Sequence, residues 1–145
     1  MEINEFVRLA IQEDVKQGDH STLSCIPKES VGSAKLLVKE NGIISGINMA
    51  KNIFKSFDSS INFKRILNDG QKVSIGDVAF IVSGRSSSIL TIERLVLNVM
   101  QRMSAISTLT NQYVEKVNGL NSKILDTRKT TPLNRFLEKQ AVMIG

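Results

Sequence analysis

Ten residues near the end of the chain, KILDTRKTTP from Lys123 to Pro132, decide how the fold is interpreted. Ile124 and Leu125 predict the middle of a short buried strand, because a short apolar run between polar residues is typical of strands inside a parallel sheet. Thr131 predicts a helix N-cap, with Pro132 at the first helical position, where the amide hydrogen that proline lacks would have no helical partner. This stretch therefore predicts a strand, a short loop and a helix.

The loop between that strand and that helix carries Thr127, Arg128, Lys129 and Thr130, two cations flanked by hydroxyl groups. Ligands of parallel sheets and barrels bind at the carboxyl ends of the strands. Two positive charges beside a helix N-terminus suit an anion with several oxygen atoms. The alternative is that Arg128 and Lys129 are ordinary solvated surface charges, and these residues alone leave both interpretations open.

The longest periodic segment of the chain precedes this stretch. Apolar residues recur every three or four positions from Ile89 to Asn118, and Gly119 provides the stop. A helix of this length extends roughly 45 Å, more than one small domain needs. We therefore expect it to bridge two units or two subunits. A last helix is expected over 132–144, with Leu133 among its inward-facing residues.

The first part of the chain predicts an α+β layer domain that ends near Gly84. Expected are helices over 4–15 and from Ile47, and strands over 31–40, 61–67 and 78–82. Asn41-Gly42 predicts a tight turn that returns the chain through Ile43 and Ile44 onto the preceding strand.

A polar stretch after the first expected helix contains Asp14, Asp19 and His20, which are metal ligands by type. Their spacing matches no recognised metal site, so turn and capping roles are favoured. Cys25 is the single cysteine and cannot form an internal disulfide, which agrees with a cytoplasmic protein. No apolar run approaches the ~20 residues that cross a bilayer, and the first residues lack the pattern of a signal peptide.

The net charge of +5 indicates an anionic partner. Nucleic-acid binding has little support, because the chain has no tryptophan, a single tyrosine (Tyr113) and no dense basic run. A small, highly charged phosphate or carboxylate ligand explains the same positive charge without requiring aromatic stacking residues or a dense basic run. We therefore expect small-molecule substrates, and neither a nucleic acid nor a membrane as partner.

One strand followed by one helix cannot close a parallel sheet, because both edges of the strand stay unpaired. We therefore expect three parts: an N-terminal α+β layer domain over 1–84, a long bridging helix region over 85–119, and the incomplete start of a C-terminal domain of strand and helix over 120–145. By this interpretation the sequence is truncated.

Several motifs resemble, in order and spacing, those of nicotinate-nucleotide pyrophosphorylase, a family also called quinolinate phosphoribosyltransferase. The resemblance spans nearly the whole chain, which makes it far more specific than Thr-Arg-Lys alone. The motifs are AIQEDVKQGDHST (10–22), GIISG (42–46), IERLVLN (92–98), MSAIST (103–108), DTRKTTP (126–132) and LEKQAV (137–142).

The resemblance implies an enzyme that converts quinolinate and phosphoribosyl pyrophosphate, with Mg²⁺, into nicotinate mononucleotide, pyrophosphate and carbon dioxide in NAD biosynthesis. It implies an α/β sandwich followed by a TIM-like barrel, and a homodimer in which Arg94 enters the partner's site. Thr127, Arg128 and Lys129 would line the dicarboxylate pocket. Metal ligands and further site residues would lie beyond Gly145, so we expect the 145 residues alone to be inactive.

Two motifs depart from the family pattern. The chain has Ala105 and Ser107 where the family usually has glycine and alanine, and Leu133-Asn134 where it often has Gly-Leu. We interpret these differences as sequence drift. Three alternatives stay open at this point: a related molybdenum-operon pyrophosphorylase-like protein, a basic nucleic-acid-binding module, and a non-catalytic assembly fragment.

Overall fold

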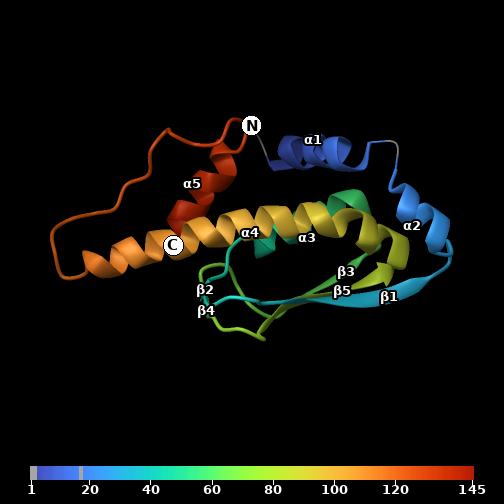
Figure 1. Cartoon of the computed structure of the whole chain (residues 1–145), viewed down its shortest axis with the longest axis horizontal. Helices are drawn as coiled ribbons and strands as arrows, with labels where there is room; N and C mark the ends of the chain where they lie inside the picture. The colour runs from blue at the N-terminus through green and yellow to red at the C-terminus, as the bar shows by residue number, and fades with distance from the viewer. Residues whose placement is uncertain (1–2, 17) are drawn as a thin grey trace.

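A single long helix, α4 (Ser86–Lys116), runs through the middle of the molecule (Figure 1). The structure is a computed structural model that describes residues 3–16 and 18–145. Met1 and Glu2 of the expected first domain, and Gln17 of the expected polar loop, lie outside the described residues. The helix predicted over 89–118 is confirmed, with both ends shifted by two or three residues.

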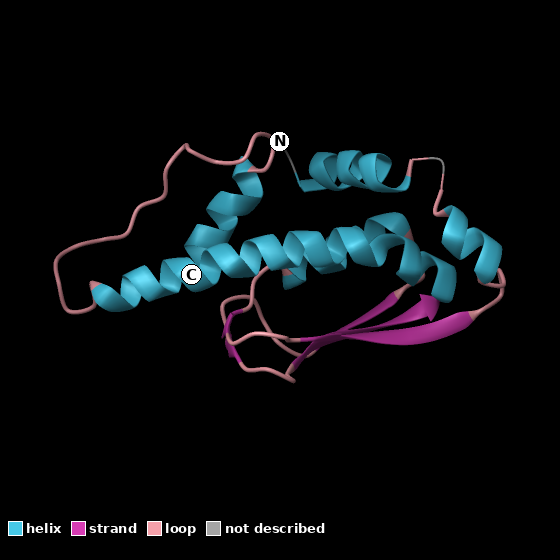
Figure 2. Cartoon of the chain, viewed as in Figure 1, coloured by secondary structure: helices cyan, strands magenta, loops and turns pink. Residues whose placement is uncertain are grey.

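An antiparallel sheet covers one side of α4 (Figures 1 and 2). Its strands lie in the order β1 (Val31–Leu37), β5 (Val78–Arg85), β3 (Asn62–Arg65). Phe80 of β5 is buried, and its ring centroid lies 4.6 Å from that of Phe63 on β3. An antiparallel sheet with helices on one face is the α+β arrangement that the sequence predicts.

The turn prediction at Asn41-Gly42 is wrong. Strand β2 (Gly42–Ile43) does not return onto β1 but pairs with β4 (Lys72–Val73), a strand that the sequence analysis did not predict. Asn41 Oδ1 accepts a hydrogen bond from the Ile75 amide (3.0 Å), and the Ile43 amide donates to Thr108 Oγ1 on α4 (2.9 Å). The backbone groups of this segment therefore find partners that are distant in the sequence.

Helix α3 (Ile47–Phe57) packs beside α4 and begins at Gly46, whose φ of +96° favours glycine. The carboxylate of Asp69 accepts hydrogen bonds from the Ile47 amide (2.7 Å) and the Asn48 amide (3.1 Å). A residue from a distant loop therefore caps this helix start, a task that a neighbouring side chain usually performs.

Two helices precede the sheet in the chain. Helix α1 (Ile3–Val15) buries Phe6 and Val7 and packs against α3 and α4. The short α2 (His20–Cys25) was not predicted; Asp19 caps it by accepting a hydrogen bond from the Thr22 amide (3.1 Å). The capping role predicted for Asp19 is therefore confirmed.

The strand predicted around Ile124 and Leu125 is wrong. Residues 117–134 form no helix or strand and none of them is buried; Figure 2 draws them as a long loop. Leu125 is 82 % exposed. A strand needs a neighbour to accept its backbone hydrogen bonds, and no strand pairs with this segment among the residues that the structure describes.

Helix α5 (Arg135–Ile144) begins three residues later than predicted, so Thr131 and Pro132 are not its N-cap and first residue. Leu133 is exposed, not inward-facing, and its φ of +66° is incompatible with a helix. The helix itself is anchored to α4, where Leu137 and Ala141 are buried and the Ser107 hydroxyl donates to the Ala141 carbonyl (2.7 Å). Ser107 therefore has a structural role, and drift does not fully explain it.

The hydrophobic core lies between the sheet and the helices α1, α3, α4 and α5. Its fully buried members include Ile47, Ile53, Ile61 and Ile92. None of the helices described here has the length and apolar character needed to span a membrane.

Candidate functional site

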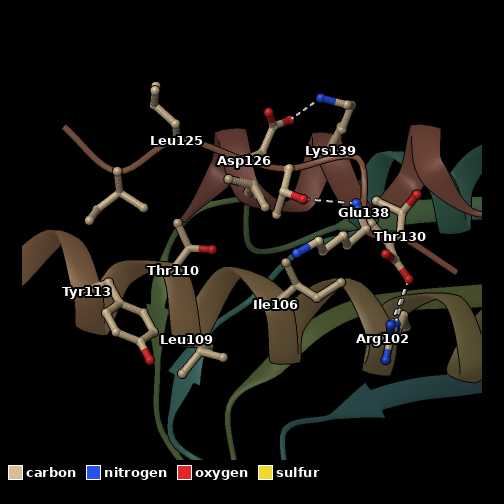
Figure 3. A pocket seen from close by; sticks show the side chains of 14 residues that line it. Arg102, Ile106, Leu109, Thr110, Tyr113, Leu125, Asp126, Thr130, Glu138 and Lys139 are labelled. Atoms are coloured by element: carbon tan, nitrogen blue, oxygen red, sulfur yellow. Dashed lines mark hydrogen bonds and ion pairs between the residues drawn. The ribbon is translucent and has the colours of Figure 1, made fainter.

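A cavity of about 370 Å³ lies between the second half of α4, helix α5 and the loop over residues 124–130 (Figure 3). We call it the α4–α5 cavity. Thr127 and Lys129, two of the predicted binding residues, line it. The other lining residues are Arg102, Ile106, Leu109, Thr110, Tyr113, Ile124, Leu125, Asp126, Thr130, Glu138, Lys139 and Val142.

One wall of the α4–α5 cavity is apolar, because α4 presents Ile106, Leu109 and Tyr113 on one face at a spacing of three or four residues. The opposite wall is charged. Lys139 and Asp126 form an ion pair there, with 2.6 Å between Nζ and Oδ2. Within the part of the chain that the structure describes, Lys129 has no carboxylate within 4.0 Å, so its charge is available to an anion.

Arg128 and Lys129 lie on a tight turn. The Lys129 amide donates to Thr127 Oγ1 (2.9 Å), and the Arg128 carbonyl accepts a long hydrogen bond from Arg135 Nη2 (3.5 Å). Hydroxyl side chains stabilise turns in this way. The Arg128 side chain is exposed and is not among the lining residues, so the turn presents its two cations in different surroundings.

Glu138 is the one buried carboxylate of the α4–α5 cavity, at 7 % exposure. Its Oε1 accepts from Arg102 Nη2 (2.7 Å) and Nε (3.1 Å), and its Oε2 accepts from the Thr131 amide (3.2 Å). Burial raises the pKa of Glu138, but the hydrogen bonds from Arg102 and Thr131 outweigh it and leave the pKa below its usual value. Glu138 is therefore ionised at neutral pH.

Arg94 lies elsewhere, on an exposed face of α4. Its Nε donates to Asp14 Oδ1 (2.9 Å) and its side chain is 66 % exposed. That hydrogen bond raises the pKa of Arg94 further. Arg94 precedes Arg102 by eight residues, about 12 Å along the helix, and does not line the α4–α5 cavity. The structure therefore does not bring Arg94 together with Lys129 within one chain, and the role predicted for Arg94 in a partner's site stays a prediction.

A larger hollow, about 610 Å³, lies between residues 36–44 and the other side of α4. Its charged lining residues are Lys39 and Glu40, which balance each other. It holds none of the predicted binding residues. The α4–α5 cavity is therefore the better candidate for an anionic ligand.

No group of three or more His, Cys, Asp or Glu side chains within residues 3–16 and 18–145 could hold a metal ion. Asp14 is engaged by Arg94 and Asp19 by helix α2. Both carboxylates that the sequence offered as metal ligands by type therefore have partners within the protein.

Sequence reasoning missed several residues that shape the candidate site. Arg102, Glu138 and Lys139 come from two helices, and the Arg102–Glu138 contact joins residues 36 positions apart. Two signals were available: the adjacent charges of Glu138 and Lys139 in an amphipathic helix, and their place in the motif LEKQAV. The partner of Arg94, Asp14, is 80 positions away and carried no such signal.

Comparison with known sequences identifies the family. The sequence model described as "Quinolinate phosphoribosyl transferase, N-terminal domain" matches residues 19–104, more than half of the chain. The chain belongs to the quinolinate phosphoribosyltransferase family. The corresponding model of the family's C-terminal domain matches residues 106–145. The boundary between the two matches falls inside α4, and the division at residues 84 and 119 stays a prediction.

Curated relatives in this family carry matching names. A "probable nicotinate-nucleotide pyrophosphorylase [carboxylating]" of Synechocystis sp. is 38 % identical over 143 residues, which are 99 % of this chain and 48 % of the relative. "Quinolinate phosphoribosyltransferase [decarboxylating] 2b, mitochondrial" of Nicotiana tabacum is 41 % identical over 145 residues, 99 % of this chain and 41 % of the relative. The chain spans less than half the length of these two relatives.

The fold agrees with the family. The crystal structure of NadC from Streptococcus pyogenes superposes with a TM-score of 0.95 at 34 % identity, over 99 % of this chain and 51 % of that one. The predicted fold class is therefore confirmed: an N-terminal domain of sheet and helices, followed by the start of the family's C-terminal domain.

Proposed function

We propose that this chain acts as part of a quinolinate phosphoribosyltransferase. We further propose that the α4–α5 cavity, with the cationic turn at its edge, contributes to binding quinolinate. The observation that carries the proposal is Lys129, a cation without an ion-pair partner among the described residues, at the edge of a cavity with an apolar wall. Quinolinate is a flat ring with two adjacent carboxylates. Such a ligand needs both kinds of surface.

The charges of the turn suit a dianion. A lysine ammonium acts as a mobile point charge, whereas an arginine guanidinium grips a carboxylate through two parallel hydrogen bonds. Lys129 would take one carboxylate at the cavity, and Arg128 would take the second from the outer side of the turn. Thr127 would contribute through the turn that its hydroxyl stabilises.

The proposed reaction forms a bond between the ring nitrogen of quinolinate and the ribosyl C1 of phosphoribosyl pyrophosphate, while the bond from C1 to pyrophosphate breaks. The ring then loses the carboxylate next to nitrogen as carbon dioxide, and a proton replaces it. The positive ring nitrogen accepts the electron pair that is left. The protein contributes orientation and fixed charge to these steps, without a covalent nucleophile.

The proposal includes a homodimer in the cytoplasm. Arg94 would enter the partner's site from an exposed face of α4, and its high exposure is compatible with that role. Its Nε and Nη2 contact Asp14, which leaves the end of the guanidinium for a ligand. Mg²⁺ would arrive with phosphoribosyl pyrophosphate, and its protein ligands are expected beyond Gly145. The expected compartment is the cytoplasm.

The alternatives from the sequence are not favoured. Both family matches and the curated names point to pyridine nucleotide chemistry, and not to a molybdenum-operon protein or a nucleic-acid-binding module.

The proposal is tested by titrating the purified chain with quinolinate in a calorimeter, with nicotinate, which has one carboxylate, as the comparison ligand. The full-length product of the gene is assayed in parallel for quinolinate-dependent release of pyrophosphate. We expect quinolinate to bind more tightly than nicotinate, and Lys129→Ala to weaken binding about tenfold or more, the loss of one charge-assisted hydrogen bond.

Lys123→Ala is the matched control, because Lys123 is an exposed lysine of the same loop that does not line the cavity. Equal effects of the two substitutions, or equal binding of the two ligands, would contradict the assignment of the α4–α5 cavity. Binding that is confined to nucleic acid and falls steeply with salt would favour the nucleic-acid alternative.

A further inference from the structure

The loop that carries the cationic turn is held in place without regular secondary structure. Residues 117–134 form no helix or strand, and none of their side chains is buried. Backbone segments of this kind are usually mobile, because few apolar contacts and backbone hydrogen bonds oppose their opening. The position of Thr127, Arg128 and Lys129 must therefore come from side-chain contacts with the rest of the fold.

The most buried of these contacts is centred on Glu138. One carboxylate oxygen binds Arg102 of α4, and the other accepts from the backbone amide of Thr131. Arg102 Nη2 also donates to Thr131 Oγ1 (3.1 Å). Arg102, Glu138 and Thr131 therefore contact one another in a closed set of hydrogen bonds, which we call the Glu138 clamp.

Two further side chains of α5 reach the same loop on either side of the cationic turn. Lys139 pairs with Asp126, and Arg135 Nε donates to Thr130 Oγ1 (3.3 Å). These contacts are more exposed than Glu138 and are weaker restraints. Helix α5 is itself fixed on α4 through Leu137, Ala141 and the Ser107 hydroxyl. The clamp therefore attaches the loop to the packed part of the molecule.

The charges of the clamp balance. Both oxygens of Glu138 are used, and the charge of Arg102 compensates that of the carboxylate. The clamp therefore adds no net charge to the α4–α5 cavity, and the attraction for an anion stays with the turn. The pair is buried on one side only, because the Glu138 side chain is 9 % exposed and the Arg102 side chain 56 %.

We propose that Glu138, with Arg102, is a positioning residue that sets the place of Thr127, Arg128 and Lys129 at the α4–α5 cavity. The identity of the ligand in this inference rests on the proposed function. The statement that Glu138 and Arg102 hold the loop does not. Glu138 does not touch the ligand in this scheme, since both of its oxygens are occupied by the protein. Its effect passes through Thr131 to the turn three residues before it.

Amide hydrogen exchange on the purified chain tests the clamp. In Glu138→Gln, an amide nitrogen must stand where one carboxylate oxygen stood, so the contacts to Arg102 and to the Thr131 amide cannot both survive. Two amides within residues 126–131 donate a hydrogen bond: that of Thr131 to Glu138 and that of Lys129 to Thr127. We expect exchange of these two amides to become about tenfold faster, the loss of one hydrogen bond, while exchange in the sheet and in α3 is unchanged.

Glu115→Gln is the matched control. It removes the carboxylate of an exposed pair, Lys72–Glu115 (3.9 Å), on the same helix as Arg102 but away from the cavity. It should leave exchange over 126–131 as in the wild type. Glu138→Asp, which keeps the charge, should restore part of the protection. If Glu138→Gln does not fold, Arg102→Lys tests the same clamp from its exposed side, because lysine cannot reproduce the two-nitrogen contact.

The link to function is tested in the full-length product of the gene, where Glu138→Gln should raise KM for quinolinate about tenfold with little change in kcat. Unchanged exchange over 126–131 overturns the clamp. Faster exchange with an unchanged KM overturns the positioning role. A wild-type protein that does not use quinolinate overturns the proposed function alone, because exchange in the same variants still decides whether Glu138 holds the loop.

Discussion

Two regions of this chain hold their residues in place by different physical means. Residues 31–116 form a sheet covered by α3 and α4, and many of their apolar side chains are fully buried. Residues 117–134 bury none of their side chains, and the loop is positioned by hydrogen bonds and ion pairs to α5. Position in the first region follows from packing, and in the second from a few polar contacts whose strength depends on charge.

The difference matters because the candidate binding residues are divided between these regions. Arg94 projects from α4, whose backbone is fixed by the core beneath it. Lys129 projects from the loop, where one buried carboxylate provides the firmest restraint. Substitutions in the core should therefore unfold the molecule, whereas substitutions in the clamp should displace the turn and leave most of the fold intact.

The largest expected difference in stability is between two truncations of an aliphatic side chain, one in each region. Ile92 of α4 is fully buried, and Ile92→Ala should lower the free energy of unfolding by about 2–5 kcal/mol, because it leaves a cavity in the core. Leu125→Ala, in the exposed loop, should change it by less than about 0.5 kcal/mol. Urea denaturation of both variants measures the difference, and equal losses would contradict the division into two regions.

Two glycines with positive φ allow a second comparison. An added Cβ at Gly46 would lie 3.2 Å from atoms of Met100 and Met103, whereas at Gly119 it would meet open space. Gly46→Ala should cost about 2–4 kcal/mol, from left-handed backbone strain plus crowding of the core. Gly119→Ala should cost about 1–2 kcal/mol, from strain alone. Thermal denaturation checks this order, and a larger loss at Gly119 would show that the loop is packed more tightly than described here.

Acid should weaken the Glu138 clamp. Glu138→Gln should lower the free energy of unfolding by about 1–3 kcal/mol at pH 7, the cost of a charge-assisted hydrogen bond. The pKa of Glu138 is lowered in the folded protein from an ordinary value of 4.5, so this advantage of the wild type is complete above that pH. It should disappear as the pH falls through the lower, folded value. Denaturation of both proteins between pH 3 and 7 measures this, and a constant difference would exclude titration of Glu138 as its source.

The smallest stability effect is expected at the ion pair of Arg94. Asp14→Asn removes the charge that faces a largely exposed guanidinium, and exposed pairs contribute little to stability. The unfolding midpoint should move less than in Ile92→Ala, Gly46→Ala or Glu138→Gln, and the small difference should vanish in 1 M salt, because salt screens exposed charges. A large loss that persists in salt would place Arg94 with the packed region and not with the exposed charges.

Much of the layered domain could be predicted from local sequence patterns. The period of apolar residues in α3 and α4 records directly which face of each helix is buried. The alternation over 31–40 predicted strand β1, but not its burial, because every residue of β1 is exposed or half-buried. The strand pairing could not be predicted in full. Strand β2 pairs with β4, and its Ile43 amide donates a hydrogen bond to Thr108 of α4, 65 positions away in the sequence. No pattern of neighbouring residues encodes a contact at that separation.

The residue types of the sequence predicted the cationic turn as a binding element, but they did not predict the structure around it. Ile124 and Leu125 have the composition of a strand, yet β structure requires a neighbouring strand, which a local pattern cannot supply. Leu133 likewise fits the helical period, while its positive φ excludes it from the helix. The fold class and the family could be predicted because they rest on ordered motifs along the whole chain.

The sequence by itself determined the four longer helices, the main strands, the family and the identity of the cations, since period, propensity and motif order are properties of neighbouring residues. Only the tertiary structure decided that Asp14 faces Arg94 and that Glu138 joins Arg102 to Thr131. Those partners are far apart along the chain. A charged side chain carries no local sign of which opposite charge it will meet, because that choice depends on how whole elements pack.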